Sequence, residues 1–157
     1  MTTLSELLAE HTTMDGETAD HLQRVVGEWQ LLADMSFADF LLWVPLDDLH
    51  AGTGGASRAA TAQFLCVAQA RPTTAPTAHP DDVVGRRAVP VEVGQLRRAV
   101  LEGRICRDDD PRWHLEVPVR RETIPVRFKG RTVAVLSRDT NLSTPRVPSP
   151  LEIAYLG

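Results

Sequence analysis

The sequence predicts an α+β domain with a central antiparallel sheet of about five or six strands and helices packed mainly on one face. Three observations predict it. Helical periodicity fills the first 36 residues, compact apolar runs follow at 37–46 and 63–72, and an alternating hairpin occupies 116–140. No helical pattern separates the two strands of either pair, so we expect each pair to be antiparallel.

Composition describes an ordinary soluble domain. The 157 residues fit one domain, residues 1–157, with 43% apolar residues, 24% charged residues and a net charge of −4. The acidic balance gives no general reason to expect nucleic-acid binding. The start, MTTLSELLAEH, lacks the basic region of a signal peptide, and no apolar run approaches the roughly 18 residues that span a bilayer. We therefore expect a cytoplasmic protein with neither a nucleic-acid nor a membrane partner.

Two helices are predicted before the first strand. Residues 3–10 begin with Thr3 and Glu6, spaced as a capping box. Residues 16–36 form the longer helix, for which Asp15 can serve as the N-cap. Its apolar residues fall at helical spacing along one face: Leu22, Val25, Val26, Trp29, Leu32 and Ala33.

Two buried strands should follow, joined by a long loop. The first run, 37–46, is closed by Pro45, and the second, 63–72, places alternate residues such as Phe64 and Cys66 on one face. The connection 46–62 is rich in Gly, Ala and Thr and has little to bury.

A second long loop, 72–90, contains four prolines and should wrap over the other face of the sheet. Residues 92–104 predict a helix through Leu96, Ala99 and Val100 that ends at Gly103. A surface turn is expected at 107–115.

The chain should close with a hairpin and begin another helix. Lys129-Gly130 turns the chain between the strands at 116–140. The last residues, SPLEIAYLG, pair Ser149 with Glu152 as a capping box and place Pro150 at the first helical position. Leu151, Ala154 and Tyr155 then start an apolar face.

Three segments together carry a family resemblance: GEWQLLADMSFADFLLWV, VAQARPTTAPTAHPDDVVG and IPVRFKGRTVAVLSRDTN. They resemble the N-terminal GAF/PAS-like sensory domain of soluble bacterial sensor histidine kinases, the PdtaS-type two-component kinases. The resemblance runs from about residue 4 to 155 and departs from the family mainly in a longer loop between Pro45 and Ala62.

The resemblance implies that this chain is a sensory domain and that 149–157 begin a linker helix to absent PAS and kinase domains. The parent protein would be a dimeric histidine kinase that regulates autophosphorylation and phosphotransfer to a response regulator. ATP and magnesium would belong to the kinase domain.

The sequence lacks the catalytic motifs that would indicate an enzyme. The sequence has no GxSxG, no glycine-rich phosphate loop and no HExxH. None of its histidines has the context of a phosphoacceptor: His11, His21, His50, His79 and His114. Two alternatives remain, a small GAF-like enzyme that uses Cys66 or Cys106, and a purely structural dimerisation module.

No metal site is predicted. His79, Asp81 and Asp82 share one loop, but zinc needs three or four ligands brought together, and the spacing of Cys66, Cys106 and His114 does not promise that. Asp81 or Asp82 could instead cap the turn before Gly85.

The preferred site is a small-ligand pocket between the sheet and the 72–90 loop, because such pockets combine apolar walls with a few polar groups. Its candidate residues are Trp43, Phe64, Cys66, Arg71, Thr73, Thr74, His79 and Asp82. Trp43 and Phe64 could equally be core, and Arg71 and Thr74 could fix the loop by bonding its backbone. The pairs Arg86-Arg87, Arg97-Arg98 and Arg120-Arg121 could meet a phosphorylated ligand, although charge runs are more often solvated.

A dimer or linker surface is expected where the helices at the two ends of the chain need cover. Its candidate residues are Leu4, Leu7, Leu8, Leu151, Tyr155 and Leu156. The alternative is that these side chains pack within their own subunit.

Overall fold

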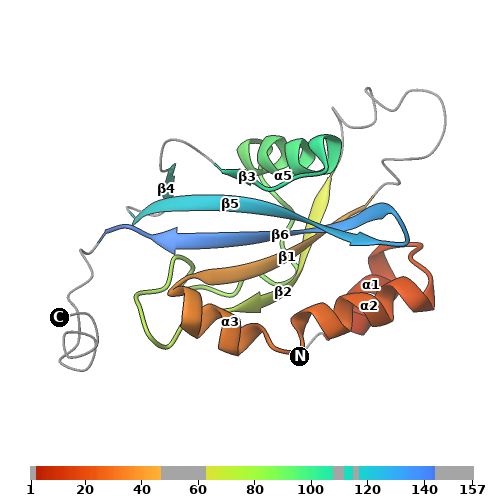
Figure 1. Ribbon diagram of the computed structural model, residues 1–157, viewed down its shortest axis with the longest axis horizontal. Coiled ribbons are helices and arrows are strands. Elements are labelled where there is room, and N and C mark those ends of the chain that lie inside the picture. The colour runs from red at the N-terminus through yellow and green to blue at the C-terminus, as the bar shows by residue number, and fades with distance from the viewer. Residues whose placement is uncertain (1–2, 47–62, 108–111, 115–116, 144–157) are drawn as a thin grey trace.

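The structure, a computed structural model, describes residues 3–46, 63–107, 112–114 and 117–143. It forms an α+β domain in which an antiparallel sheet carries helices on both faces, so the predicted fold class is confirmed (Figure 1). The elements, in chain order, are α1 (Leu4–His11), α2 (Gly16–Val26), α3 (Trp29–Ser36), β1 (Asp39–Pro45), β2 (Phe64–Ala70), α5 (Pro90–Glu102), β3 (Cys106–Arg107), β4 (Arg112–His114), β5 (Val117–Phe128) and β6 (Arg131–Asn141).

β6, the last of the described strands, lies in the middle of the sheet. The strand order is β2-β1-β6-β5-β3, with β4 also paired to β5. The predicted pairing of β1 with β2 and the hairpin of β5 with β6 are both present. Lys129 and Gly130 turn the hairpin with φ values of 52° and 77°, as a tight turn of this kind requires.

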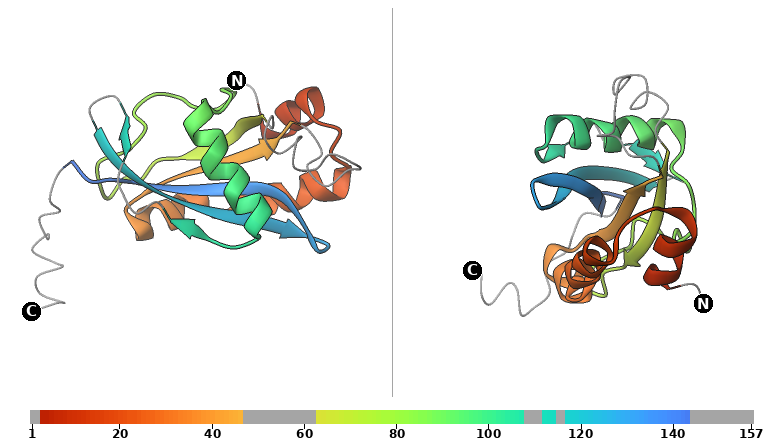
Figure 2. Two further views of the ribbon diagram at one scale, coloured as in Figure 1. Left: turned by 90° about the horizontal axis from the view of Figure 1, so that it is seen from above. Right: turned by 90° about the vertical axis from the view of Figure 1, so that its right-hand side faces the viewer.

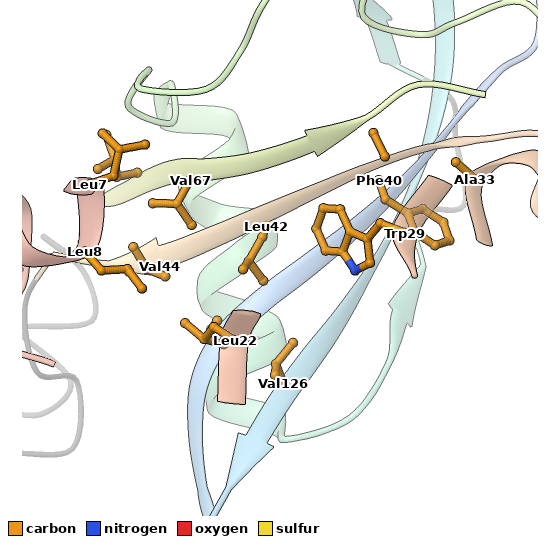
Figure 3. Packing of buried hydrophobic residues seen from close by; sticks show 13 residues of the cluster. Leu7, Leu8, Leu22, Trp29, Ala33, Phe40, Leu42, Val44, Val67 and Val126 are labelled. Atoms are coloured by element: carbon orange, nitrogen blue, oxygen red, sulfur yellow. The ribbon is translucent and has the colours of Figure 1, made fainter. Parts of the chain in front are cut away.

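One face of the sheet is covered by α1, α2 and α3, and its core is apolar. Thr3 and Glu6 form the predicted capping box of α1, and the Asp15 side chain accepts from Thr18 N at the start of α2. In Figure 3, Leu22 of α2 lies near Leu42 and Val126, and Trp29 of α3 lies against Phe40. The rings of Trp29 and Phe40 meet edge to face, with centroids 5.9 Å apart.

The opposite face is covered mainly by α5, which corrects the expectation that the 72–90 loop would wrap over it (Figure 2). Leu96, Ala99 and Val100 of α5 pack on the sheet, because they share one side of the helix. The loop adds only Val83 and Ala88 to this core. Gly103 ends α5 with φ 62°, as predicted.

The single helix expected at 16–36 is wrong, because two helices occupy that range. Gly27 N donates to Arg24 O, a tighter bond that ends α2, and Glu28 leaves helical geometry with φ −116° and ψ 18°. The break turns α3 so that Trp29 and Ala33 face the sheet while Leu32 does not.

The surface turn expected at 107–115 is partly wrong, because strands occupy some of these residues. Arg107 ends β3 and Arg112–His114 form β4, and both strands pair with β5. Residues 47–62 of the expected loop lie outside the described residues, and so does the whole of the expected helix start at 149–157. Within the described part of the chain, no helix is long and apolar enough to cross a membrane.

Candidate functional site

Three charged residues lie side by side across the sheet, on the face that α5 covers. Asp39 of β1 pairs with Asp139 of β6, and Asp139 pairs with Arg121 of β5. Directly opposed residues of antiparallel strands point to the same face. All three side chains are buried. A buried charge is costly unless it is paired and hydrogen-bonded, so their partners define the site.

Asp139 is the centre of this buried charge network, which consists of Asp39, His79, Glu92, Arg121 and Asp139. Arg121 binds it with two parallel bonds, Nε to Oδ1 and Nη2 to Oδ2, both 2.8 Å long. His79 Nε2 lies 2.6 Å from Asp139 Oδ2, and the imidazole donates because a carboxylate oxygen only accepts. The fork-shaped guanidinium and the ring together fix the carboxylate in one orientation.

Arg121 extends the network to α5. Its Nη1 donates to Glu92 Oε2 at 2.8 Å and to Gln95 Oε1 at 3.2 Å. Its guanidinium carbon lies 5.7 Å from the ring centroid of Trp43, close enough for a cation–π contact. Trp43 Nε1 in turn donates to Ser137 Oγ at 3.1 Å.

Asp39 holds the loop that follows β2. Its carboxylate accepts from Ala78 N at 2.8 Å, from His79 N at 3.2 Å and from Thr77 Oγ1. This carboxylate therefore satisfies backbone donors that a proline-rich loop cannot pair internally.

Further side chains anchor the same loop from three other elements. Asp34 of α3 accepts from the backbone and hydroxyl of Thr73 at 2.7 and 2.9 Å. Asn141 at the end of β6 donates to Thr77 O at 2.9 Å. Gln69 of β2 accepts from Val83 N at 2.8 Å. The loop is thus bonded to α3, β1, β2 and β6 at once.

The two buried carboxylates are tuned in opposite directions. Burial raises the pKa of Asp39 above its ordinary value, although its hydrogen bonds oppose the shift. Burial also acts to raise the pKa of Asp139, but the charge of Arg121 and the bonds from Arg121 and His79 outweigh it, so the pKa lies well below the usual range. Asp139 is therefore firmly ionised, whereas the charge on Asp39 is held less favourably.

The predicted pocket residues are divided among several places. His79 joins the buried charge network, and Arg71 Nε donates to His79 O at 2.7 Å. Thr74 donates to Asp34 O at 2.7 Å, beside Thr73. Arg71 and Thr74 thus make the loop-fixing bonds that were the alternative for them.

Asp82 accepts from Val84 N at 3.1 Å and so makes the local turn contact anticipated for it. Trp43, Phe64 and Cys66 are buried in the core beneath α5. A ligand pocket among the eight residues stays a prediction.

One arginine of each predicted Arg pair has a side-chain partner of its own. Arg87 Nη1 donates to Gln63 Oε1 at 2.5 Å, Arg98 bonds Glu102, and Arg121 is buried in the network. A cluster of three or more His, Cys, Asp or Glu side chains able to hold a metal ion is absent among the residues described.

Of the predicted dimer residues, Leu7 and Leu8 are buried in the core of their own subunit and Leu4 packs against it. This packing within the subunit supports the intramolecular alternative for α1, and a dimer surface at these residues stays a prediction. Leu151, Tyr155 and Leu156 lie outside the described residues.

The sequence analysis did not identify Asp39 or Asp139, the two central carboxylates of the network. It named Arg121 only as a member of the pair Arg120-Arg121. A detectable pattern existed, because Asp39 is in phase with the inward Leu41 and Trp43, and Asp139 with the inward Val135. A charge at an inward position of an alternating strand indicates a buried partner.

Comparison with known proteins gives one consistent result. A family model described as "Histidine kinase PdtaS, GAF domain" matches residues 4–157. The chain is 44% identical over 163 residues to the sensor histidine kinase PdtaS of Mycolicibacterium smegmatis, and 41% identical over 162 residues to that of Mycobacterium tuberculosis. Each alignment covers 99% of this chain and 29% of the relative, so the chain spans less than a third of these relatives.

A solved structure is also similar. It is described as the sensor region of a sensor histidine kinase and superposes with a TM-score of 0.67 at 40% sequence identity. The match covers 99% of this chain and 49% of that one.

Proposed function

The chain belongs to the family of PdtaS histidine kinase GAF domains, and from this premise we propose that it is the signal-input domain of a cytoplasmic two-component histidine kinase. The observation that carries the proposal is the family match over residues 4–157, together with relatives named as sensor histidine kinases. Those relatives are more than three times longer than the matched region, which supports PAS and kinase domains elsewhere in the parent.

In this proposal the parent is a homodimer that phosphorylates itself with ATP and magnesium and passes the phosphoryl group to a response regulator. The domain described here performs no phosphoryl transfer. Its role is to bias the kinase between two states, as a ligand or partner binds one arrangement of the domain better than another.

The loop between β2 and α5 is the proposed moving part. Thr77 and His79 of this loop bond Asn141 and Asp139, which lie at the end of β6. A small ligand that binds against Arg71, Thr73 or Thr74 would compete with or reinforce these bonds. A change in the loop would then alter the end of β6.

The proposal can be tested by autophosphorylation of the full-length parent. Asn141→Ala removes a bond from loop to β6 and removes no buried charge, so the domain should stay folded. We expect the autophosphorylation rate to change by about threefold or more, within the range of ordinary allosteric coupling. Thr140→Ala, the neighbouring position on the strand, is the matched control. Equal rates in the parent and both variants would contradict the role of the loop, and the lack of any autophosphorylation would contradict the kinase assignment.

The raised pKa of each thiol argues against the alternative of a small cysteine enzyme. Burial raises the pKa of Cys66 to about 12. Burial, followed by the Glu102 carboxylate 3.2 Å from its sulfur, raises the pKa of Cys106. Since the thiolate is the reactive form, neither group is prepared as a nucleophile at neutral pH.

A thermal-shift screen can distinguish a sensor domain from the alternative, a purely structural module. A ligand present at about 100 times its Kd stabilises a folded domain by about 2.7 kcal/mol. Nucleotides, metal ions and haem form the first screen. A shift with any of them supports a sensor, and no shift with a broad library favours the structural module.

A further inference from the structure

Exposed large apolar side chains gather on both outer sides of the molecule. Leu31, Leu32 and Met35 of α3 are 58%, 41% and 68% exposed. Leu101 near the end of α5 and Ile105 just after this helix are 62% and 60% exposed. The two helices lie on opposite sides of the sheet, α5 above it and α3 below it in Figure 1. Large apolar side chains that gather in one exposed place indicate an interaction surface, whereas scattered ones do not.

The two outer layers also carry opposite charge. Residues 3–36, which form α1, α2 and α3, contain seven carboxylates and one arginine, a net charge of −6 with histidine neutral. Residues 84–107, which include α5, contain six arginines and two glutamates, a net charge of +4. The overall charge of −4 therefore hides a strong polarity across the sheet. Surfaces of opposite potential steer association with one another.

On α3 the negative charge and the apolar side chains share the outer side of the helix. Glu28 directly precedes α3 and is exposed, and it is followed at spacings of three and four residues by Leu31 and Met35. Trp29 and Ala33 are buried on the side that faces the sheet. The acidic patch is defined as Glu28, Leu31, Leu32 and Met35.

On α5 two arginines flank the exposed apolar side chains. Arg98 Nε lies 3.4 Å from Glu102 Oε1, and Arg104 Nε lies 3.1 Å from Glu102 Oε2. One carboxylate thus faces two guanidinium groups, so the local charge stays positive. Both arginines are more than half exposed, and ion pairs at such positions are weak enough to rearrange around a partner. The basic patch is defined as Arg98, Leu101, Arg104 and Ile105.

We propose that copies of this chain associate head to tail, with the acidic patch of one copy on the basic patch of the next. Two like patches would oppose charges of the same sign, whereas unlike patches place Glu28 near Arg98 or Arg104. Leu31 and Met35 then pack against Leu101, which gives the contact an apolar centre and a charged rim.

The contact is small and does not close on itself. About four side chains on each copy bury less area than a standard interface of about 1,600 Å², so the association is weak and transient. Because two different patches on opposite faces meet, the copies at the two ends of a row each keep one patch free, and further copies can add. Such association requires neither a kinase domain nor a ligand, so it is independent of the proposed function.

Sedimentation equilibrium of the 157-residue chain measures the association. The weight-average mass should rise above that of one chain between micromolar and millimolar concentrations. The Kd should increase about tenfold between low salt and about 0.5 M NaCl, where the Debye length falls below about 5 Å. A single chain at every concentration, or association that salt leaves unchanged, would overturn the proposal. This salt series uses the unmodified chain, so it does not depend on the folding of any variant.

Charge-reversing variants distinguish head-to-tail contacts from the pairing of like patches. The double variant Leu31→Lys, Met35→Lys blocks the acidic patch, and Arg98→Glu, Leu101→Glu blocks the basic patch. All four positions are exposed, so the fold should persist. Each double variant alone should be monomeric, whereas an equimolar mixture should form a one-to-one complex and nothing larger, because one intact patch of each kind remains. Self-association of either variant, a mixture that stays monomeric, or a mixture that grows beyond two chains would contradict head-to-tail pairing.

Arg87→Glu, Val89→Glu is the matched control for the basic patch. It changes the net charge by the same amount as Arg98→Glu, Leu101→Glu, and both of its positions are exposed just before α5, at the end opposite Leu101. Its Kd for self-association should stay within about twofold of the unmodified value, as for other surface changes outside a contact. If the control weakened association as much as the patch variant, net charge rather than the basic patch would drive it, and the proposal would be wrong.

Discussion

The two faces of the sheet are built on different physical principles. The face beneath α1, α2 and α3 is filled by buried apolar side chains such as Leu22, Trp29 and Leu42. The face beneath α5 has a smaller apolar core, which adjoins the buried charges of Asp39, Arg121 and Asp139.

The difference shows what fixes the positions of side chains and loops on each face of the sheet. Apolar packing is non-directional and tolerates substitutions that conserve volume. A bidentate Arg–Asp pair and a carboxylate that accepts from backbone amides are directional and fix the groups that they join. The charged face is therefore suited to hold a loop in one defined place, whereas the apolar face supplies bulk stability.

The largest expected effect is the loss of one buried charge. Asp139→Ala leaves Arg121, only 7% exposed, without its main partner and should destabilise the domain by about 3–5 kcal/mol in denaturant unfolding. The double variant Asp139→Leu, Arg121→Met should recover most of this loss, because it removes both charges. Glu122→Ala, which breaks the partly exposed pair with Arg138, should cost less than about 1 kcal/mol. Equal losses for Asp139→Ala and Glu122→Ala would contradict the contrast between the faces.

A cavity in the apolar face should come next. Leu22 is fully buried, so Leu22→Ala should cost about 2–4 kcal/mol through lost burial and an incompletely collapsed cavity. Leu32→Ala on the adjacent helix is the control, since Leu32 is 41% exposed and should lose far less. The apolar face would be less tightly packed than described if the two leucines proved equivalent.

The two carboxylates should respond to pH with opposite signs. Because the folded pKa of Asp139 lies below the ordinary value of 3.8, its stabilisation is complete above that pH and is lost as the pH falls through the folded pKa. The folded pKa of Asp39 lies above 3.8, so its contribution is complete below that value and is lost as the pH rises through the folded pKa.

Unfolding free energies measured between about pH 3 and pH 6 should reveal this difference. The cost of Asp139→Asn should grow with pH, and the cost of Asp39→Asn should shrink. If both costs moved in the same direction, the assignment of opposite pKa shifts would be wrong.

The smallest effect should come from the edge of the network. Asn141→Ala removes the hydrogen bond to Thr77 O and the exposed bonds that Asn141 Oδ1 accepts from Ser143, and it should cost about 1 kcal/mol. Amide exchange in the loop around Thr77 and His79 should rise more than exchange in β1 or β5. Thr140→Ala, whose side chain lies on the other face of the strand, should change neither quantity.

Much of the fold could be predicted because its rules are local. The capping pairs of α1 and α2, the positive φ at Gly103 and the Lys129-Gly130 turn each depend on a few adjacent residues. The break at Gly27 was not predictable in this way, because the apolar spacing continues across it from Val26 to Trp29. Packing on the sheet decides where that helix bends.

The site was less predictable because its bonds join distant parts of the chain. His79 is 60 residues from Asp139, and Arg121 is 18 residues away. The composition of the loop indicated His79 as a candidate residue. No local pattern pairs His79 with Asp139, because the place of β6 in the sheet cannot be derived from neighbouring residues. Arg121 follows another arginine, so its inward direction became evident only once the strand phase was known.

The strand order has a consequence for how the molecule is made. Of the strands described, β6 leaves the ribosome last, yet it lies between β1 and β5, and Trp43 meets Ser137 across 94 residues of chain. Until β6 emerges, β1 has an unpaired edge that is open to strands of neighbouring nascent chains. A ribosome that stalls before residue 131 would release a product whose sheet is split into β1–β2 on one side and a lone β5 with its short edge strands on the other.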